Sequence, residues 1–145
     1  MSSAGGRMFR RVLVGFDGSP GAERAVRAGL EIGAEVVAVS VIPKRQVETE
    51  EDERAAFQSE AQPLKAQAEL FRGEAEELGV AYRFEAIAGW HPAEMLAELV
   101  EERGFDLLVV GRHGRQRATH PGMGRETRQL VEQTSFPLLV VGNSS

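Results

Sequence analysis

The most informative part of the chain is Leu107-Leu108-Val109-Val110-Gly111-Arg112-His113-Gly114. Gly124 follows ten residues after Gly114. The four apolar residues have the length and composition of a buried strand. The two glycines that follow allow a tight turn with exposed backbone amides. Gly124 opens a segment of helical period, and the unpaired amides of a helix start favour an anion. The spacing therefore predicts a strand, a phosphate-binding loop and a helix start.

This glycine spacing resembles the Gly-x2-Gly-x9-Gly-(Ser/Thr) signature of the ATP-binding universal stress proteins, with Gly111, Gly114 and Gly124 in place. Val12-Leu13-Val14-Gly15-Phe16-Asp17-Gly18-Ser19 is similar to the opening strand of that family. Phe136-Pro137-Leu138-Leu139-Val140-Val141 is similar to its closing strand. The resemblance thus extends over nearly the whole chain.

Length and composition limit the class of the protein. A chain of 145 residues can bury one core unaided. Its net charge of -5 argues against a general nucleic-acid or membrane-surface binder, which needs a basic face. The absence of cysteine excludes disulfide and thiolate chemistry, and no segment is long enough to span a bilayer. We expect a cytoplasmic protein with a flexible tail over residues 1–9 and one universal stress protein domain over residues 10–145.

Apolar runs of strand length alternate with stretches of helical period, which predicts βαβ units and a parallel sheet covered on both faces. The resemblance implies a single-domain, open five-stranded α/β sheet of Rossmann-like type, in the order 3-2-1-4-5. Strands are expected near Val12–Asp17, Val36–Ile42, Val80–Ala88, Leu107–Val110 and Leu138–Val141. Helices are expected after Ser19-Pro20 as far as Gly33, along Leu64–Leu78 with Pro63 in the first turn, from Pro92, and from Gly124 to about Thr134.

In a sheet of this order the winding direction reverses between the first and fourth strands, and ligands bind beyond the strand ends at such a point. Asp17 and Gly111 end those two strands, so two distant segments are expected to share one crevice. In the family, the corresponding positions contact adenine, ribose and phosphates. The resemblance implies these binding residues: Gly15, Phe16, Asp17, Val41, Val110, Gly111, Arg112, His113, Gly114, Gly124, Arg125, Glu126 and Thr127.

Three of the residues near this crevice have a structural alternative. Val41 is either a core residue or, as the family pattern implies, an adenine contact. Asp17 either contacts a ribose hydroxyl or a metal-bridged phosphate, or shapes the turn into the first helix with Gly18-Ser19. Trp90 follows the third strand and either stacks on a base or covers a domain edge.

Arginines crowd the predicted loop and helix start, and Arg125 stands where the signature has a hydroxyl. They either form a cage for a polyanion or balance acidic residues on a solvated loop. Glu126 opposes the cage, because a carboxylate in the first helical turn gains about 0.3–1 kcal/mol from the helix dipole and competes for the same amides. The arginines are Arg112, Arg115, Arg117, Arg125 and Arg128.

The sequence therefore predicts a stress-response regulatory module that binds ATP with Mg²⁺, or another phosphate-bearing nucleotide, without an assigned catalytic or metal-binding residue. One alternative is a family dimer that does not bind ATP, with Glu126 occupying the anion site. The other is a slow metal-dependent nucleotide hydrolase that uses Asp17. Family members typically pair their fifth strands, so the resemblance implies a homodimer through Leu138–Val141. No nucleic-acid or membrane partner is expected.

Overall fold

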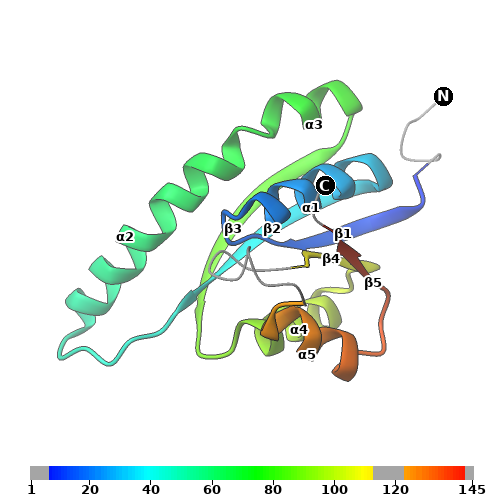
Figure 1. Cartoon of the computed structure of the whole chain (residues 1–145). Helices are drawn as coiled ribbons and strands as arrows, with labels where there is room; N and C mark the ends of the chain where they lie inside the picture. The colour runs from blue at the N-terminus through cyan, green and yellow to red at the C-terminus, as the bar shows by residue number, and fades with distance from the viewer. Residues whose placement is uncertain (1–6, 113–122, 143–145) are drawn as a thin grey trace.

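A five-stranded parallel sheet in the order β3-β2-β1-β4-β5 forms the middle layer of the protein, as predicted (Figure 1). The structure is a computed structural model that describes residues 7–112 and 123–142. Helices α1, α2 and α3 cover one face of the sheet, and α4 and α5 cover the other. The elements are β1 (Phe9–Gly15), α1 (Pro20–Ile32), β2 (Gly33–Pro43), α2 (Glu50–Glu69), α3 (Arg72–Leu78), β3 (Ala81–Gly89), α4 (Pro92–Arg103), β4 (Leu107–Gly111), α5 (Arg125–Gln133) and β5 (Leu138–Val141).

The two faces of the sheet are separated by the alternation of side chains along each strand. In β1, Val12 and Val14 pack towards α1, whereas Leu13 packs towards α4, and all three are fully buried. β4 follows the same rule, with Val109 on the first face and Leu108 on the second. The near-continuous apolar runs predicted for strands buried on both sides are therefore confirmed.

Helix α1 begins and ends where its sequence favours a helix boundary. Ser19 caps it by accepting a 3.1 Å hydrogen bond from the Ala22 amide, and Pro20 occupies the first turn. The helix ends at Ile32, and Gly33 begins β2 at once in extended conformation. A Cβ atom on Gly33 would lie only 2.7 Å from Cγ2 of Val12, so this junction requires a glycine.

The second helix differs from its prediction at both ends. It begins at Glu50, capped by Thr49, and not near Pro63, which lies inside the helix on an exposed surface. The acidic run of the first turn explains the early start, because negative charge is favourable near a helix N-terminus. The helix is then interrupted at Leu70 and Phe71, after which α3 starts separately. Pro63 was therefore wrongly predicted to mark the first turn.

Tyr82 fixes the end of α2 to the beginning of β3. Its side chain is buried, and its hydroxyl donates a 2.6 Å hydrogen bond to the carbonyl of Ala68. Burial raises the pKa of Tyr82 above its ordinary value. The hydroxyl therefore stays protonated and available as a donor in the folded chain.

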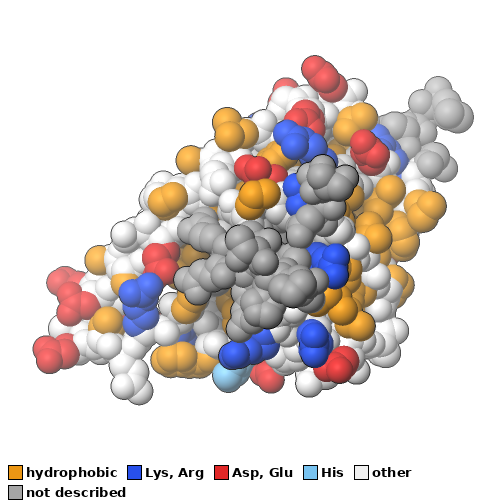
Figure 2. Space-filling view, viewed as in Figure 1, with side chains coloured by type: hydrophobic (Ala, Val, Ile, Leu, Met, Phe, Trp, Pro, Cys, Tyr) orange, Lys and Arg blue, Asp and Glu red, His pale blue; other side chains and the backbone are white. Residues whose placement is uncertain are grey.

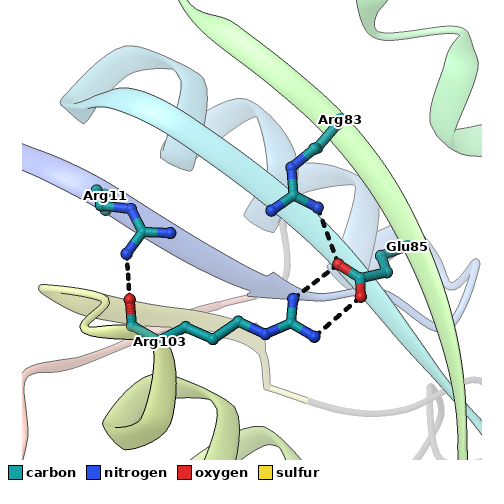
Figure 3. Close-up of polar contacts among 4 residues, drawn as sticks. All are labelled: Arg11, Arg83, Glu85 and Arg103. Atoms are coloured by element: carbon teal, nitrogen blue, oxygen red, sulfur yellow. Dashed lines mark hydrogen bonds and ion pairs between the residues drawn. The ribbon is translucent and has the colours of Figure 1, made fainter.

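Glu85 fixes the end of α4 to the edge of the sheet (Figure 3). Its carboxylate accepts hydrogen bonds of 2.8 and 3.0 Å from Arg103 and one of 2.9 Å from Arg83. These guanidinium groups, Arg103 first, hold the pKa of Glu85 below its usual range. Arg11 of β1 completes the group by donating to the carbonyl of Arg103 and lying over the ring of Phe105.

Within the described residues, no helix is both long enough and apolar enough to cross a membrane.

Candidate functional site

The carboxyl ends of β1 and β4 lie side by side, at the point where the chain reverses its direction of winding. Val14 pairs with Val109 in the last register position of the two strands, so Gly15 and Val110 follow together at the same edge. The predicted convergence of two distant segments at this edge is confirmed by the strand order. The site is built from the residues just beyond this pair.

The floor between the two strand ends is apolar and closely packed. A Cβ atom on Gly15 would lie 3.0 Å from Cδ1 of Leu96 and 3.2 Å from Cγ1 of Val110. Val41, at the end of β2, is half-buried and packs against the same cluster. Gly15, Val41 and Val110 thus share one face of the sheet, and Leu96 of α4 adds a floor residue that was expected only as a core residue of its helix.

Phe16 lies on the other face of the sheet. Its side chain is buried in the core beneath α1, together with Val14. Its amide donates a 2.8 Å hydrogen bond to the carbonyl of Val39, and its carbonyl accepts one from the hydroxyl of Ser40. The backbone and the side chain of Phe16 are therefore both used by the fold. Ser40 was also missed, although a buried serine inside the apolar run Val36–Ile42 is a signal of such a bond.

Asp17 shapes the turn that leads from β1 into α1. Its Oδ1 atom accepts a 2.9 Å hydrogen bond from the amide of Ser19, and Gly18 in between has a φ of 80°. Ser19 in turn caps α1 through the amide of Ala22. Asp17 is exposed at the crevice edge, but these side chains already occupy amides at the start of α1. The N-terminus of α1 is thus a capped helix end.

Gly111 allows β4 to touch the first turn of α1. A Cβ atom on Gly111 would lie 2.9 Å from the carbonyl carbon of Gly21 and 3.2 Å from the amide nitrogen of Ala22. Because these are backbone atoms, no side chain can move aside to make room. The glycine of the predicted phosphate loop is therefore also required for packing.

Helix α5 is held against the end of β4 by hydrogen bonds. The amide of Gly124 donates a 2.8 Å bond to the carbonyl of Arg112, whose own amide donates to Val141 of β5 at 3.0 Å. The hydroxyl of Thr127 donates a 2.8 Å bond to the carbonyl of Gly111, and Thr127 is 6% exposed. The start of α5 is thus positioned beside the crevice by residues that do not depend on a ligand.

The start of α5, unlike that of α1, carries no side-chain cap. Gly124 is the N-cap residue and has no side chain to offer. Among the described residues, no hydrogen bond reaches the backbone amides of Arg125, Glu126 or Thr127. Arg125 and Glu126 are exposed, and the Glu126 carboxylate accepts no hydrogen bond within this part of the chain. This helix start therefore has donors available for an anion.

The predicted loop and its arginines are described in part. His113 and Gly114 lie outside the described residues, as do Arg115 and Arg117. Arg112, Arg125 and Arg128 are described and exposed. Figure 2 shows Lys and Arg side chains at several places on one face of the molecule.

A protein-family model matches nearly the whole chain. The model of the universal stress protein family matches residues 8–142. The chain belongs to the universal stress protein family.

Two proteins that are similar to this chain in sequence are also named universal stress proteins. Universal stress protein MJ0577 of Methanocaldococcus jannaschii is 24% identical over 155 residues, which cover 92% of this chain and 95% of that protein. Universal stress protein Slr1230 of Synechocystis is 34% identical over 64 residues, which cover 44% of this chain and 22% of that protein. The chain therefore matches about a fifth of Slr1230 but almost all of MJ0577.

Solved structures of universal stress proteins share the fold. MJ0577 superposes with a TM-score of 0.82 at 24% identity, covering 95% of this chain and 99% of that one. A universal stress protein in complex with cAMP has a TM-score of 0.66 at 26% identity, covering 94% and 99%. A family protein from Arabidopsis thaliana with AMP bound has a TM-score of 0.63 at 15% identity, covering 94% and 93%. The universal stress protein fold is therefore shared over the full domain.

Proposed function

We propose that this universal stress protein binds ATP, or another phosphate-bearing nucleotide, in the crevice beyond β1 and β4, and acts as a stress-response regulatory module. The observation that carries the proposal is the uncapped start of α5. Its first amides have no partner in the described chain, while those of α1, at the same edge, are capped by Ser19. An anionic ligand at α5 would satisfy these donors.

The ligand would lie across the ends of the strands. Phosphates at the start of α5 would place the ribose beyond Gly15 and Asp17, and the base over the half-buried Val41. Two similar proteins are complexes with cAMP and AMP, which supports an adenine nucleotide as the first ligand to test. Arg112, Arg125 and Arg128 would contribute positive charge to phosphate oxygens.

Mg²⁺ would enter this site with the nucleotide. No three metal-ligating side chains come together within residues 7–112 and 123–142. Mg²⁺ needs few protein ligands when phosphates supply oxygens, and Asp17 is the carboxylate at this edge. Because Asp17 already holds the Ser19 amide, its role in the turn is favoured over that of a hydrolytic residue. We therefore assign no catalytic residue.

The position of Glu126 bears on the alternative of a dimer that does not bind ATP. Its carboxylate is exposed and does not fold back onto the amides of α5. In water, two unit charges about 5 Å apart repel by only about 0.8 kcal/mol. Glu126 would weaken phosphate binding by a small factor and would not occupy the anion site.

We also assign dimer formation to β5. It is an edge strand in the sheet order, and Leu139 on it is 37% exposed. Val131 of the neighbouring α5 is 45% exposed as well. An unpaired apolar edge strand is an association site, and pairing of two β5 strands would cover it.

Titration calorimetry of nucleotide-stripped protein with MgATP tests the proposal, with Glu126→Val as the matched variant. Micromolar binding by the wild type, strengthened about fourfold in the variant, is the expected result. Binding by the variant alone would instead support the ATP-free dimer in which Glu126 blocks the site. The proposal would be overturned if neither protein bound MgATP and if MgATP left the melting temperatures of both proteins unchanged.

A further inference from the structure

The chain's only tryptophan, Trp90, lies at the same edge of the sheet as the proposed nucleotide site. We infer that Trp90 forms the outer wall of the base site and stacks on the base of the bound nucleotide. This inference rests on the proposed function and extends it to the residue that holds the base.

The position of Trp90 is fixed by the paired ends of β2 and β3. Gly89, the last residue of β3, pairs with Pro43, the last residue of β2. The pairing continues one step further, because the amide of Lys44 donates a 3.1 Å hydrogen bond to the carbonyl of Gly89. Trp90 follows Gly89 directly, and α4 begins two residues later at Pro92. The backbone of Trp90 is therefore held at the carboxyl edge of the sheet.

Gly89 also connects Trp90 to Val41, the residue expected under the base. A Cβ atom on Gly89 would lie 3.3 Å from Cγ1 of Val41 and 2.7 Å from Cε of Met95. The backbone of Gly89 thus lies directly against the Val41 side chain. The Cα atom of Trp90 is only about 3.8 Å from that of Gly89, since consecutive Cα atoms are this far apart. The backbone of Trp90 therefore lies close to Val41.

The side chain of Trp90 is available for a ligand. It is 58% exposed, although Phe16 and Phe71 are buried in the same domain. A planar aromatic ring left in water offers a face on which any base can stack. Removal of such a stacked ring typically weakens binding by about 5- to 150-fold.

The dimensions of the sheet suit a ligand that reaches from Trp90 to α5. Three strand spacings of about 4.8 Å separate β3 from β4 in the order of the sheet, or about 14 Å in all. A nucleoside triphosphate carries its base and its terminal phosphate at opposite ends, with the ribose between them. Its phosphates at α5 and its base at Trp90 would therefore be reached by one extended molecule. A purine would bind better than a pyrimidine, because its larger ring shares more area with the indole.

Fluorescence of the native chain tests the inference, because Trp90 is its only source of indole emission. MgATP is expected to quench this emission, whereas magnesium tripolyphosphate, which has no base, is expected to bind without changing it. Trp90→Ala should raise the Kd for MgATP by about 5- to 150-fold and leave the Kd for tripolyphosphate unchanged. Trp90→Phe, which keeps a ring, should lose only part of the affinity.

Leu70→Ala is the matched control, since Leu70 is 76% exposed and lies at the end of α2, away from this edge. It should leave both Kd values unchanged, and the melting temperatures of all variants should match that of the wild type. If MgATP binds by calorimetry while the emission is unchanged and Trp90→Ala binds equally well, the inference is wrong and the proposed function stands. If neither MgATP nor tripolyphosphate binds, both are wrong.

Discussion

The hydroxyl of Thr127 donates a 2.8 Å hydrogen bond to the carbonyl of Gly111, which joins the first turn of α5 to the last residue of β4. These two residues are 16 positions apart in the chain. Their bond keeps the uncapped start of α5 beside the strand ends at which the ligand is proposed to lie. Gly111 of the predicted motif and Thr127, a predicted binding residue, thus have a structural role before any ligand binds.

Thr127→Val should destabilise the domain by about 1–3 kcal/mol, because it removes a buried donor and leaves the Gly111 carbonyl without it. Denaturant unfolding measures this change. Thr127→Ser keeps the hydroxyl and should recover most of the loss. Thr134→Val is a useful control within the same helix region, because Thr134 donates only to the local carbonyl of Leu130. An equal loss in both valine variants would contradict the special role of the Thr127 bond.

Gly111→Ala should cost about 1–3 kcal/mol of unfolding free energy, because its Cβ atom would meet the backbone of Gly21 at 2.9 Å. Gly73→Ala provides the opposite case. A Cβ atom at Gly73 meets nothing within 4 Å, and the residue lies inside α3. This control should be neutral or stabilise by up to about 1 kcal/mol. The melting temperature of Gly111→Ala should therefore fall below that of the wild type, whereas that of Gly73→Ala should equal or exceed it.

Glu85→Gln should reduce stability by about 0.5–1 kcal/mol at neutral pH, a value lowered to allow for solvent around the partly exposed Arg103. The pKa of Glu85 is lowered in the folded chain, so its contribution is present above the ordinary value of 4.5. The contribution is lost as the pH falls through the folded pKa. The difference between wild type and variant should thus narrow below about pH 4.5.

Glu101→Gln is the control for Glu85, since Glu101 is exposed and has no ion pair among the described residues. Urea unfolding at pH 7 and at pH 3 compares the two variants. A gap at Glu85 that stays constant between these pH values would contradict the charged role of its carboxylate.

Leu139→Arg should convert the proposed dimer to a monomer, because two charged side chains would face each other across paired β5 strands. Sedimentation velocity measures the change. Leu70→Arg places the same charge on another exposed apolar residue and should leave the oligomeric state unaltered. A wild-type chain that sediments as a monomer, or a Leu139→Arg dimer, would overturn the assignment of β5.

The parallel sheet could be predicted because its strands are apolar on both sides, and its order because the motifs of the chain resemble those of a known family. The start of α2 could not, since Pro63 and the acidic run at Glu50 are both acceptable in a first helical turn. The break at Leu70 is likewise absent from the sequence pattern, because the apolar spacing continues through it to Leu78.

The sequence indicated which segments meet at this edge of the sheet, whereas the positions of several side chains are clear only in the structure. Strand alternation already indicates the face of Phe16. Phe16 lies two residues after Val14 and therefore faces α1 as Val14 does. Helical spacing also indicates that Thr127 faces the core, because it lies one turn before the buried Leu130. Gly124, which has no side chain, already indicated an uncapped start for α5. The position of the Glu126 carboxylate could not be predicted, since it depends on the fold.

The hydrogen bond between Tyr82 and Ala68 gives the protein an intrinsic spectroscopic probe of its folding. The chain has a single tyrosine, and its raised pKa means that folding holds the phenol neutral while the unfolded phenol ionises near pH 10.0. Stability from this group is therefore lost as the pH rises above that value. Phenolate absorbance of Tyr82 in alkaline solution would report the release of α2 from the beginning of β3. The fluorescence of Trp90 would report changes at the end of β3. Two ends of one strand can thus be followed independently in an unlabelled sample.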